Sequence, residues 1–331
     1  MNHLSSNFLD RYRRNKGTYQ LKAVVKEMGE KNKNKLVYYI NDKKLFFGSL
    51  FILMPEIDDL NLYEQLNIRN ITALKICAKI TEDEKLKEKV ESLSSENREN
   101  MFYAIKWMVN TGHYDDGLNN KFDEVLDAAV SQMIKTYEDK TILPAVAEMI
   151  FKRNRKNQFT HDLIWAFFES RDPYVLEIIA RYLRSSNKKD VELASNLLSC
   201  NLSDEGLHMM RPKSYSAYLS WLKENSPFIY FSGESFQQTS HPSPWRVNLS
   251  KKYLCQGPKV QNKKNTQPIT AEAQSEQLQS FNQLNDTERI LLSEYSYKMY
   301  KKNIHLWEKW IKSPVNRQME IAKKGLGGIM K

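Results

Sequence analysis

The feature that most constrains the fold is a series of short segments, between about residues 94 and 223, in which apolar residues recur at helical spacing. Residues 122–136 show the pattern clearly, and residues 160–169, 173–183, 191–198 and 215–223 repeat it. A short helix with one broad apolar face cannot bury that face alone, so neighbouring helices must pack on it. The pattern predicts a mainly α fold with a short, irregular stack of helical hairpins in residues 94–225.

Two of these segments, residues 172–183 and 189–198, share a finer pattern. In each, an aspartate opens the helix, a β-branched residue follows soon after, a small residue is placed to be buried, and a leucine closes the segment. Comparable helix starts recur about every 30 to 40 residues, the range of two-helix repeats. Residues 121–223 therefore resemble HEAT-type helical repeats. The resemblance implies an α-solenoid, a fold that presents a curved surface to a partner, and it implies no enzymatic activity.

Residues 1–93 are less regular and predict a small N-terminal lobe that is either α+β or helical. Residues 36–40 and 45–47 are β-prone and are separated by Asn41-Asp42-Lys43-Lys44. Because Asn and Asp tolerate turn dihedrals, residues 36–47 are predicted to form a β-hairpin. The competing interpretation makes residues 45–54 a buried helix, because a short apolar run does not reveal its period.

Three segments of different character follow the helical series. Residues 226–255 combine Ser, Gly and Pro with aromatic residues, which predicts an ordered strap packed on the body of the protein. Residues 256–281 are rich in Gln, Asn, Lys and Ser and predict a flexible linker. Residues 282–331 predict a basic amphipathic C-terminal helix that Pro314 should break or kink.

Composition limits the class of protein further. Of the 331 residues 41% are hydrophobic, so the chain can bury a sizeable core, and 11 glycines and 10 prolines argue against a turn-rich all-β sandwich. No apolar run approaches the length of a membrane span, and the first thirty residues predict no signal peptide. The three cysteines, Cys77, Cys200 and Cys255, are too scattered for a disulfide framework. We therefore expect a soluble protein in a reducing compartment, the cytoplasm.

The positive charge is concentrated at the two ends of the chain. Residues 1–35 contain nine Lys/Arg against three Asp/Glu, and residues 282–331 contain ten against five. Cations with aromatic residues among them could grip phosphates while the rings stack on bases. The residues predicted for this role are Arg11, Arg13, Arg14, Lys16, Lys298, Lys301 and Lys302. Solubility alone would also account for lysine-rich ends.

Aromatic residues in the C-terminal segment allow two further interpretations. A basic amphipathic helix can lie on an anionic membrane surface. It can also dock its aromatic stripe into a groove of a partner protein or of the same chain. Protein docking is the preferred interpretation, because Trp and Tyr contribute most of the binding energy at interfaces. The residues predicted to bind a partner are Trp245, Tyr295, Met299, Trp307 and Trp310.

Candidate catalytic and metal-binding groups are few. His113, Asp115 and Asp116 are metal-type ligands in one loop. Such clusters between helices commonly arise by chance, and no second group of ligands follows at the fixed spacing of a metal-binding motif. Cys200 and His208 would need a third residue that orients the histidine before they could act as a nucleophile and base. We therefore predict no metal, no cofactor and no catalytic residue.

The sequence thus favours a non-enzymatic adaptor or scaffold. It would bind a protein partner through the helical-repeat surface and through the C-terminal helix, and the linker between these two sites would raise avidity. The alternative is a nucleic-acid-binding protein that acts through its basic N- and C-terminal segments. The identity of the partner and the oligomeric state stay open.

Overall fold

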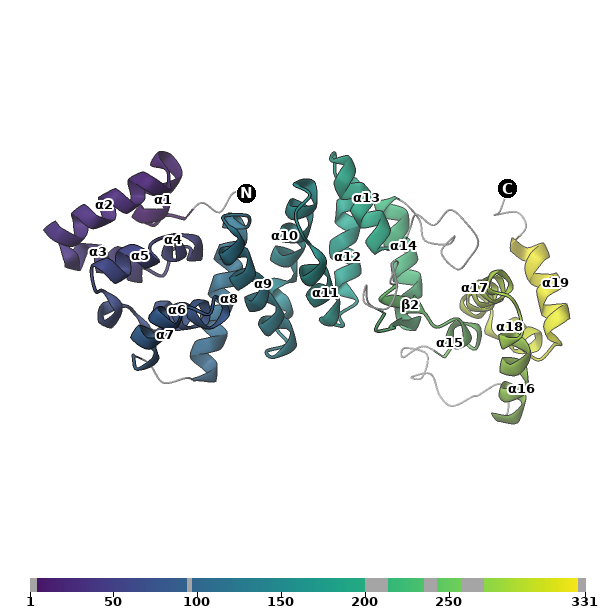
Figure 1. Ribbon diagram of the computed structural model, residues 1–331. Helices are drawn as coiled ribbons and strands as arrows, with labels where there is room; N and C mark the ends of the chain where they lie inside the picture. Colours follow the sequence, from purple (N-terminus) through teal and green to yellow (C-terminus); the bar gives the residue numbers. More distant parts are fainter. Residues whose placement is uncertain (1–4, 94–96, 200–213, 235–242, 257–270, 327–331) are drawn as a thin grey trace. The chain divides into compact units, whose positions relative to one another are not determined.

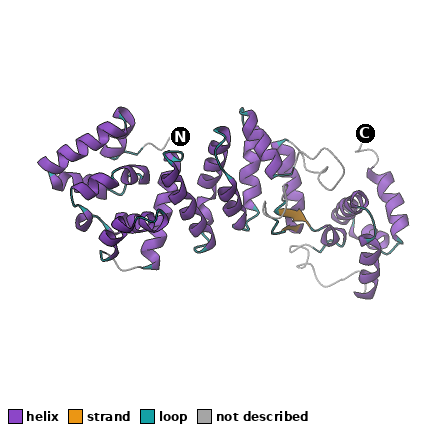
Figure 2. Cartoon of the chain, in the orientation of Figure 1, coloured by secondary structure: helices purple, strands orange, loops and turns teal. Residues whose placement is uncertain are grey.

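The protein is mainly helical, as the sequence predicted. The computed structural model describes residues 5–93, 97–199, 214–234, 243–256 and 271–326 (Figure 1). These residues form nineteen α-helices, a few short 3₁₀ turns and one two-stranded sheet (Figure 2). No helix within these ranges is long and apolar enough to cross a membrane.

The chain divides into two compact units, Met1–Asp172 and Pro173–Lys331. Unit 1 contains 27 Lys/Arg and 26 Asp/Glu, whereas unit 2 contains 23 Lys/Arg and 14 Asp/Glu. The excess positive charge of the chain therefore belongs mostly to unit 2. The boundary falls inside residues 94–225, which the sequence suggested as one helical domain.

Unit 1 is built from short helices whose apolar stripes face a common core. Asparagine side chains cap several of them: those of Asn7, Asn32, Asn67, Asn97 and Asn119 each accept a hydrogen bond from a backbone N–H of the first turn. The helices are α1 (Phe8–Lys16), α2 (Thr18–Lys31), α3 (Lys33–Asn41), α4 (Phe47–Ile52), α5 (Met54–Asp59), α6 (Ile68–Ile80), α7 (Glu84–Glu91), α8 (Arg98–Gly112), α9 (Asn120–Lys135), α10 (Leu143–Arg155) and α11 (His161–Glu169).

The β-hairpin predicted for residues 36–47 is wrong, because these residues belong to α3, a short connection and the start of α4. Leu36 and Ile40 are both fully buried, one helical turn apart, so they lie on the same face of α3. Asn41 ends the helix instead of forming a hairpin turn. The alternative interpretation, a buried helix within residues 45–54, is closer to the structure, although the helix breaks at Leu53 into α4 and α5.

Unit 2 begins with three helices of the predicted series and continues into the C-terminal segments. Its strands pair antiparallel, with Tyr230 opposite Arg246. Its elements are α12 (Tyr174–Arg181), α13 (Lys188–Leu197), α14 (Tyr215–Asn225), β1 (Ile229–Phe231), β2 (Trp245–Val247), α15 (Leu249–Tyr253), α16 (Ala271–Asn282), α17 (Asp286–Lys302), α18 (Ile304–Ile311) and α19 (Val315–Leu326).

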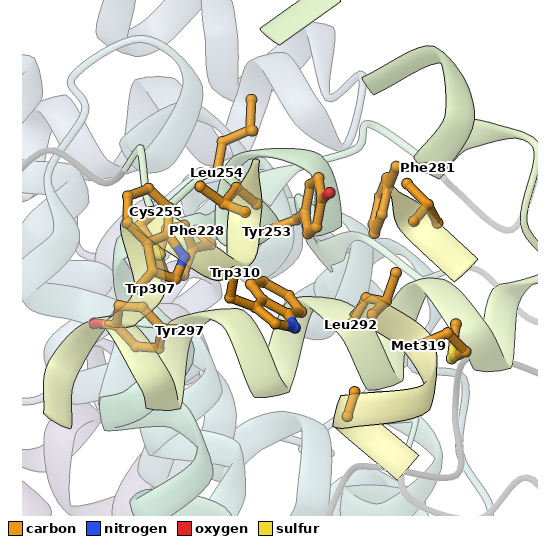
Figure 3. Packing of buried hydrophobic residues seen from close by; sticks show 13 residues of the cluster. Phe228, Tyr253, Leu254, Cys255, Phe281, Leu292, Tyr297, Trp307, Trp310 and Met319 are labelled. Carbon is orange, nitrogen blue, oxygen red and sulfur yellow. The ribbon is translucent and has the colours of Figure 1, made fainter. Parts of the chain in front are cut away.

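An aromatic core joins the predicted strap to the C-terminal helices (Figure 3). The ring of Tyr253 in α15 stacks on that of Phe281 in α16, with centroids 4.4 Å apart. The ring of Phe228 meets that of Tyr297 edge-on at 4.9 Å. Phe228 and residues 253–255 of the predicted strap therefore share one hydrophobic core with residues of α16 to α19.

Two sequence predictions for the C-terminal half need correction. The flexible linker is wrong for residues 271–281, which lie in α16; residues 257–270 lie outside the described residues. The helix predicted for residues 282–331, with a break or kink at Pro314, has a further break among its described residues, because Asn303 ends α17 and its side chain accepts a hydrogen bond from Leu306 N at 3.0 Å to begin α18. The predicted break at Pro314 is confirmed, since it separates α18 from α19.

Candidate partner-binding groove

Helix α9 has two faces of opposite character. Its predicted apolar stripe is fully buried and consists of Phe122, Val125, Leu126, Ala129, Val130 and Met133. Positions three and four residues apart on a helix share a face. Burial of the apolar stripe therefore turns a second row outward, and this row consists of Asn120, Asp123, Glu124, Asp127, Ala128 and Ser131. The outward row is acidic.

The outward row of α9 lines a groove with a volume of about 730 Å³. Helix α11, which packs against α9, contributes Asp162 and Trp165. The rest of the lining is Ile80 of α6, Arg153 at the end of α10, and Gln158 and Phe159 of the loop before α11. Four carboxylates and one guanidinium thus line the groove, so its lining has an excess of negative charge.

Arg153 holds the centre of the groove in place. Its Nη1 and Nη2 donate to the two carboxylate oxygens of Asp127 at 2.8 and 2.7 Å, and its Nε donates to Asp116 Oδ1 at 2.8 Å. This two-pronged geometry is the one in which a guanidinium orients a carboxylate most firmly. Asp123 Oδ1 accepts a hydrogen bond from Gly117 N at 2.7 Å, which positions the next carboxylate along α9.

The buried charges leave the cluster with an excess of negative charge. The pKa of Asp127 is raised to about 6: burial raises it most and the charges of Asp116 and Asp123 add to that effect, whereas the hydrogen bonds and charge of Arg153 lower it. Burial lowers the pKa of Arg153, but Asp127 and Asp116 outweigh that effect and raise it. Burial also raises the pKa of Asp123. Asp116 and Asp127 share one guanidinium, and the charge of Lys152 also acts on Asp116 and Asp123.

The groove also contains aromatic surface that already accepts a cation. Lys135 Nζ lies 3.6 Å from the centroid of the Trp165 ring, within the range of a cation–π interaction. Phe159 adds a second ring that is 68% exposed. Carboxylates beside an aromatic face match the chemistry of a lysine or arginine side chain.

A second hollow, of about 380 Å³, continues along the same helices. Lys135 lines it together with Ile134, Glu138, Asp139, Lys140, Glu169, Ser170 and Arg171. The two hollows follow one another from the beginning to the end of α9, which has 16 residues and is therefore about 24 Å long. An extended peptide of about seven residues would span that length.

The three candidate metal ligands do not converge. His113 Nδ1 lies 3.2 Å from Val109 O, Asp115 accepts two hydrogen bonds from Arg13, and Asp116 accepts from Arg153. Among the described residues no group of three His, Cys, Asp or Glu side chains could hold a metal ion. Cys200 and His208 lie outside the described residues.

The residues predicted to bind a partner through the C-terminal segment pack on unit 2 itself. Trp307 and Trp310 are 3–4% exposed and lie in the aromatic core (Figure 3). Trp245 is 4% exposed, and Tyr295 and Met299 are partly buried against the same core. Trp307 Nε1 donates to Ser296 Oγ at 2.7 Å. The aromatic stripe therefore docks on its own chain, an alternative that the sequence left open, and it is not available to a partner in this conformation.

The predicted phosphate-binding cations have different surroundings. Arg13 donates to both oxygens of Asp115 at 2.8 and 2.7 Å, and Arg14 donates to Ser5 O at 2.8 Å. Arg11 and Lys16 are exposed on α1. Lys298, Lys301 and Lys302 are exposed on the last two turns of α17, and Lys301 Nζ lies 4.2 Å from the Tyr297 ring centroid.

Sequence reasoning missed the groove residues Asp123, Asp127, Arg153 and Trp165. The available signal was the acidic character of the positions between the apolar residues of α9. A charged outward face is ordinary on a surface helix, so this signal does not distinguish a groove from solvated surface. The packing of α11 beside α9, which supplies Trp165, requires the tertiary structure.

Searches of known family models, of curated proteins and of solved structures found no match to this chain. The chemistry of the groove is therefore the basis for the functional proposal.

Proposed function

We propose that this protein is a non-enzymatic adaptor whose α9–α11 groove binds a cationic segment of a partner protein. The observation that supports the proposal is the combination of four carboxylates and the Trp165 ring in one groove of about 730 Å³. We also propose that the short helices of residues 121–223 stack in a HEAT-like manner, an arrangement suited to presenting such a surface.

The recognition would combine charge with an aromatic contact. Glu124 is exposed and Asp162 has a side-chain exposure of 66%, so a partner cation could reach both without complete desolvation. Asp162 and Trp165 are three residues apart and share a face of α11. One arginine side chain could pair with the carboxylate and compete with Lys135 for the Trp165 ring. Arg153 would act as a positioning residue that keeps Asp127 in place.

The proposal does not include the tethered C-terminal helix that the sequence suggested. Trp307 and Trp310 lie in the core of unit 2, so exposing them to a partner would require that core to open. The helical surface of unit 1 therefore remains as the proposed binding site.

The test uses a fluorescent peptide of about seven residues that alternates alanine with lysine or arginine, titrated with the full-length protein in an anisotropy assay. The double variant Glu124→Gln, Asp162→Asn should weaken binding by about 2- to 30-fold, the range expected for two exposed ion pairs. A matched control, Glu88→Gln with Glu91→Gln on α7, removes the same charge from exposed sites outside the groove. Equal weakening by both double variants would show that attraction is general and that the groove is not the binding site.

The pH dependence provides a second readout. Because the pKa of Asp127 is about 6, lowering the pH through 6 should protonate this carboxyl, leave Arg153 less neutralised and weaken the binding of the cationic peptide. Asp127→Asn should remove that step. The raised pKa of Asp127 also affects stability. Between about pH 4 and 6 this carboxyl binds a proton in the folded chain but not in the unfolded chain. The free energy of unfolding should therefore fall as the pH rises through this window.

A further inference from the structure

A row of four aromatic rings crosses from α1 to α3 in unit 1. The ring of Tyr12 lies 5.7 Å from that of Phe8, Phe8 stacks on Tyr39 at 5.0 Å with an interplanar angle of 27°, and Tyr39 lies 5.7 Å from Tyr38. Tyr38 is 71% exposed, and the other three rings are partly buried. The row is therefore a surface feature, with its most accessible ring at the α3 end.

Exposed cations flank the row of rings. Lys16 lies one helical turn after Tyr12 on α1, and Lys35 lies one turn before Tyr38 on α3. Arg11 is also exposed, as are Lys43 and Lys44 immediately after α3. The hydrogen bond from Ser5 Oγ to Lys44 O, at 2.7 Å, ties the start of α1 to that segment, so both groups of cations belong to one local structure.

The carboxylates of the same region are engaged within the protein. Asp10 is buried and accepts hydrogen bonds from Ser5 Oγ at 2.6 Å and Ser49 Oγ at 2.5 Å. Asp42 accepts one from Asn7 Nδ2 at 3.1 Å. Residues 5–44 contain eleven Lys/Arg against four Asp/Glu. Arg13, Lys22, Lys26 and Lys31 form ion pairs with carboxylates, and the other seven cations leave this region positively charged.

We infer that the ring row of α1 and α3, together with its flanking cations, binds single-stranded nucleic acid. Unpaired bases offer faces that stack on aromatic side chains, and the phosphates between them are attracted to lysine and arginine. In a duplex the bases stack on one another, so their faces are not accessible to the aromatic side chains of α1 and α3.

Two other anionic partners fit this surface less well. An acidic protein segment would use the cations but would not require a row of rings. Insertion into a membrane requires exposed apolar side chains, and the large hydrophobic side chains exposed within residues 5–44 are Tyr19 and Tyr38, whose hydroxyl groups are polar. The combination of rings and cations therefore favours the nucleic acid.

The experiment measures the binding of labelled oligothymidylate and oligouridylate, each about twelve nucleotides long, to the full-length protein by fluorescence anisotropy. Affinity should fall steeply between about 50 and 200 mM salt. Tyr38→Ala should weaken binding by about 5- to 150-fold, whereas Tyr38→Phe should preserve it because the stacking face remains. The double variant Arg11→Ala, Lys16→Ala should reduce the slope of log affinity against log salt by about 0.7 per lost phosphate contact.

The matched control is Tyr103→Ala, which removes a tyrosine that is 59% exposed on α8 and should leave oligonucleotide affinity unchanged. Unchanged affinity in Tyr38→Ala would overturn the inference, because the site would then act through cations alone. Absence of binding at the lowest salt would also overturn it. Stronger competition by polyglutamate or by phosphatidylserine vesicles than by unlabelled oligothymidylate would assign the surface to an acidic protein or a membrane instead.

Discussion

The two basic segments of the chain use similar residues and give them opposite surroundings. In α1 to α3 the ring of Tyr38 is exposed and that of Tyr12 is partly buried, with exposed lysines and arginines near them in sequence. In α17 and α18 the rings of Tyr297, Trp307 and Trp310 are buried, and the lysines remain outside. An alternation of cations and aromatic residues therefore does not indicate by itself whether the rings serve folding or binding.

The difference arises from what packs on each segment. Phe228, Tyr253 and Phe281 cover the aromatic face of α17 and α18, so those rings contribute to the stability of unit 2. The rings of α1 and α3 contact one another and leave Tyr38 exposed. Large aromatic side chains stabilise a core when they are covered and supply binding energy when they are exposed. Four substitutions test this contrast.

The largest effect should come from Trp310→Ala, which removes a side chain that is 4% exposed and leaves a cavity in the core of unit 2. The free energy of unfolding should fall by about 3–5 kcal/mol. Hydrogen exchange of α17 and α18 in the full-length chain would locate the loss. Leu306→Ala, at a position that is 56% exposed on the same helix, is the control and should change stability by less than about 0.5 kcal/mol. Similar losses in both variants would contradict the buried position of Trp310.

A smaller loss in the free energy of unfolding is expected for Lys252→Met. Burial lowers the pKa of Lys252, whereas its charge partner Glu294 raises it. Lys252 Nζ donates to Asn225 Oδ1 at 2.6 Å and also to Glu294. Methionine would keep the shape but leave Glu294, which is 12% exposed, without its cation, at a cost of about 1.5–3 kcal/mol measured by urea unfolding. Lys16→Met on the exposed face of α1 should cost almost nothing, and a comparable loss there would remove the contrast between the two segments.

Arg13→Ala tests whether the N-terminal cations are equivalent. Loss of its two hydrogen bonds to Asp115, in a pair whose side chains are 10% and 18% exposed, should lower the free energy of unfolding by roughly 1.5 kcal/mol. Arg11→Ala should leave stability unchanged in the same thermal unfolding assay. If Arg11→Ala were the more destabilising variant, Arg11 would have a structural role and would not be available to phosphates.

The smallest effect on stability is expected for Tyr38→Ala, which removes an exposed ring. Thermal unfolding should show a change within about 0.5 kcal/mol, since substitutions at the surface away from special features are usually nearly neutral. A stable variant with weakened oligonucleotide binding would sharpen the contrast with Trp310. A marked loss of stability would show that the ring row is part of the fold.

Much of the secondary structure could be predicted from hydrophobic periodicity. The stripes at residues 122–136, 160–169 and 215–223 correspond to α9, α11 and α14, because a row of apolar side chains at helical spacing must be buried along one face. The groove could not be predicted, because α9 supplies its carboxylates and α11 supplies Trp165, and their packing is a tertiary contact.

The start of α13 was predicted less well, because aspartate was favoured over asparagine. The pattern of residues 189–198 indicated Asp190 as the opening residue, whereas Asn187 caps the helix. Asn and Asp are about equally good caps, so local sequence does not choose between neighbouring candidates.

The sequence determines the helical class, the break at Pro314, the acidic outward face of α9 and the concentration of cations at both ends, because each depends on local spacing or composition. Tertiary structure decides which aromatic residues become core and which remain at the surface, and it turns the polar residues 271–282 into a helix whose Phe281 stacks on Tyr253. The physical reason is that burial depends on contacts between segments that are distant in sequence, and these contacts leave no periodic signal in either segment alone.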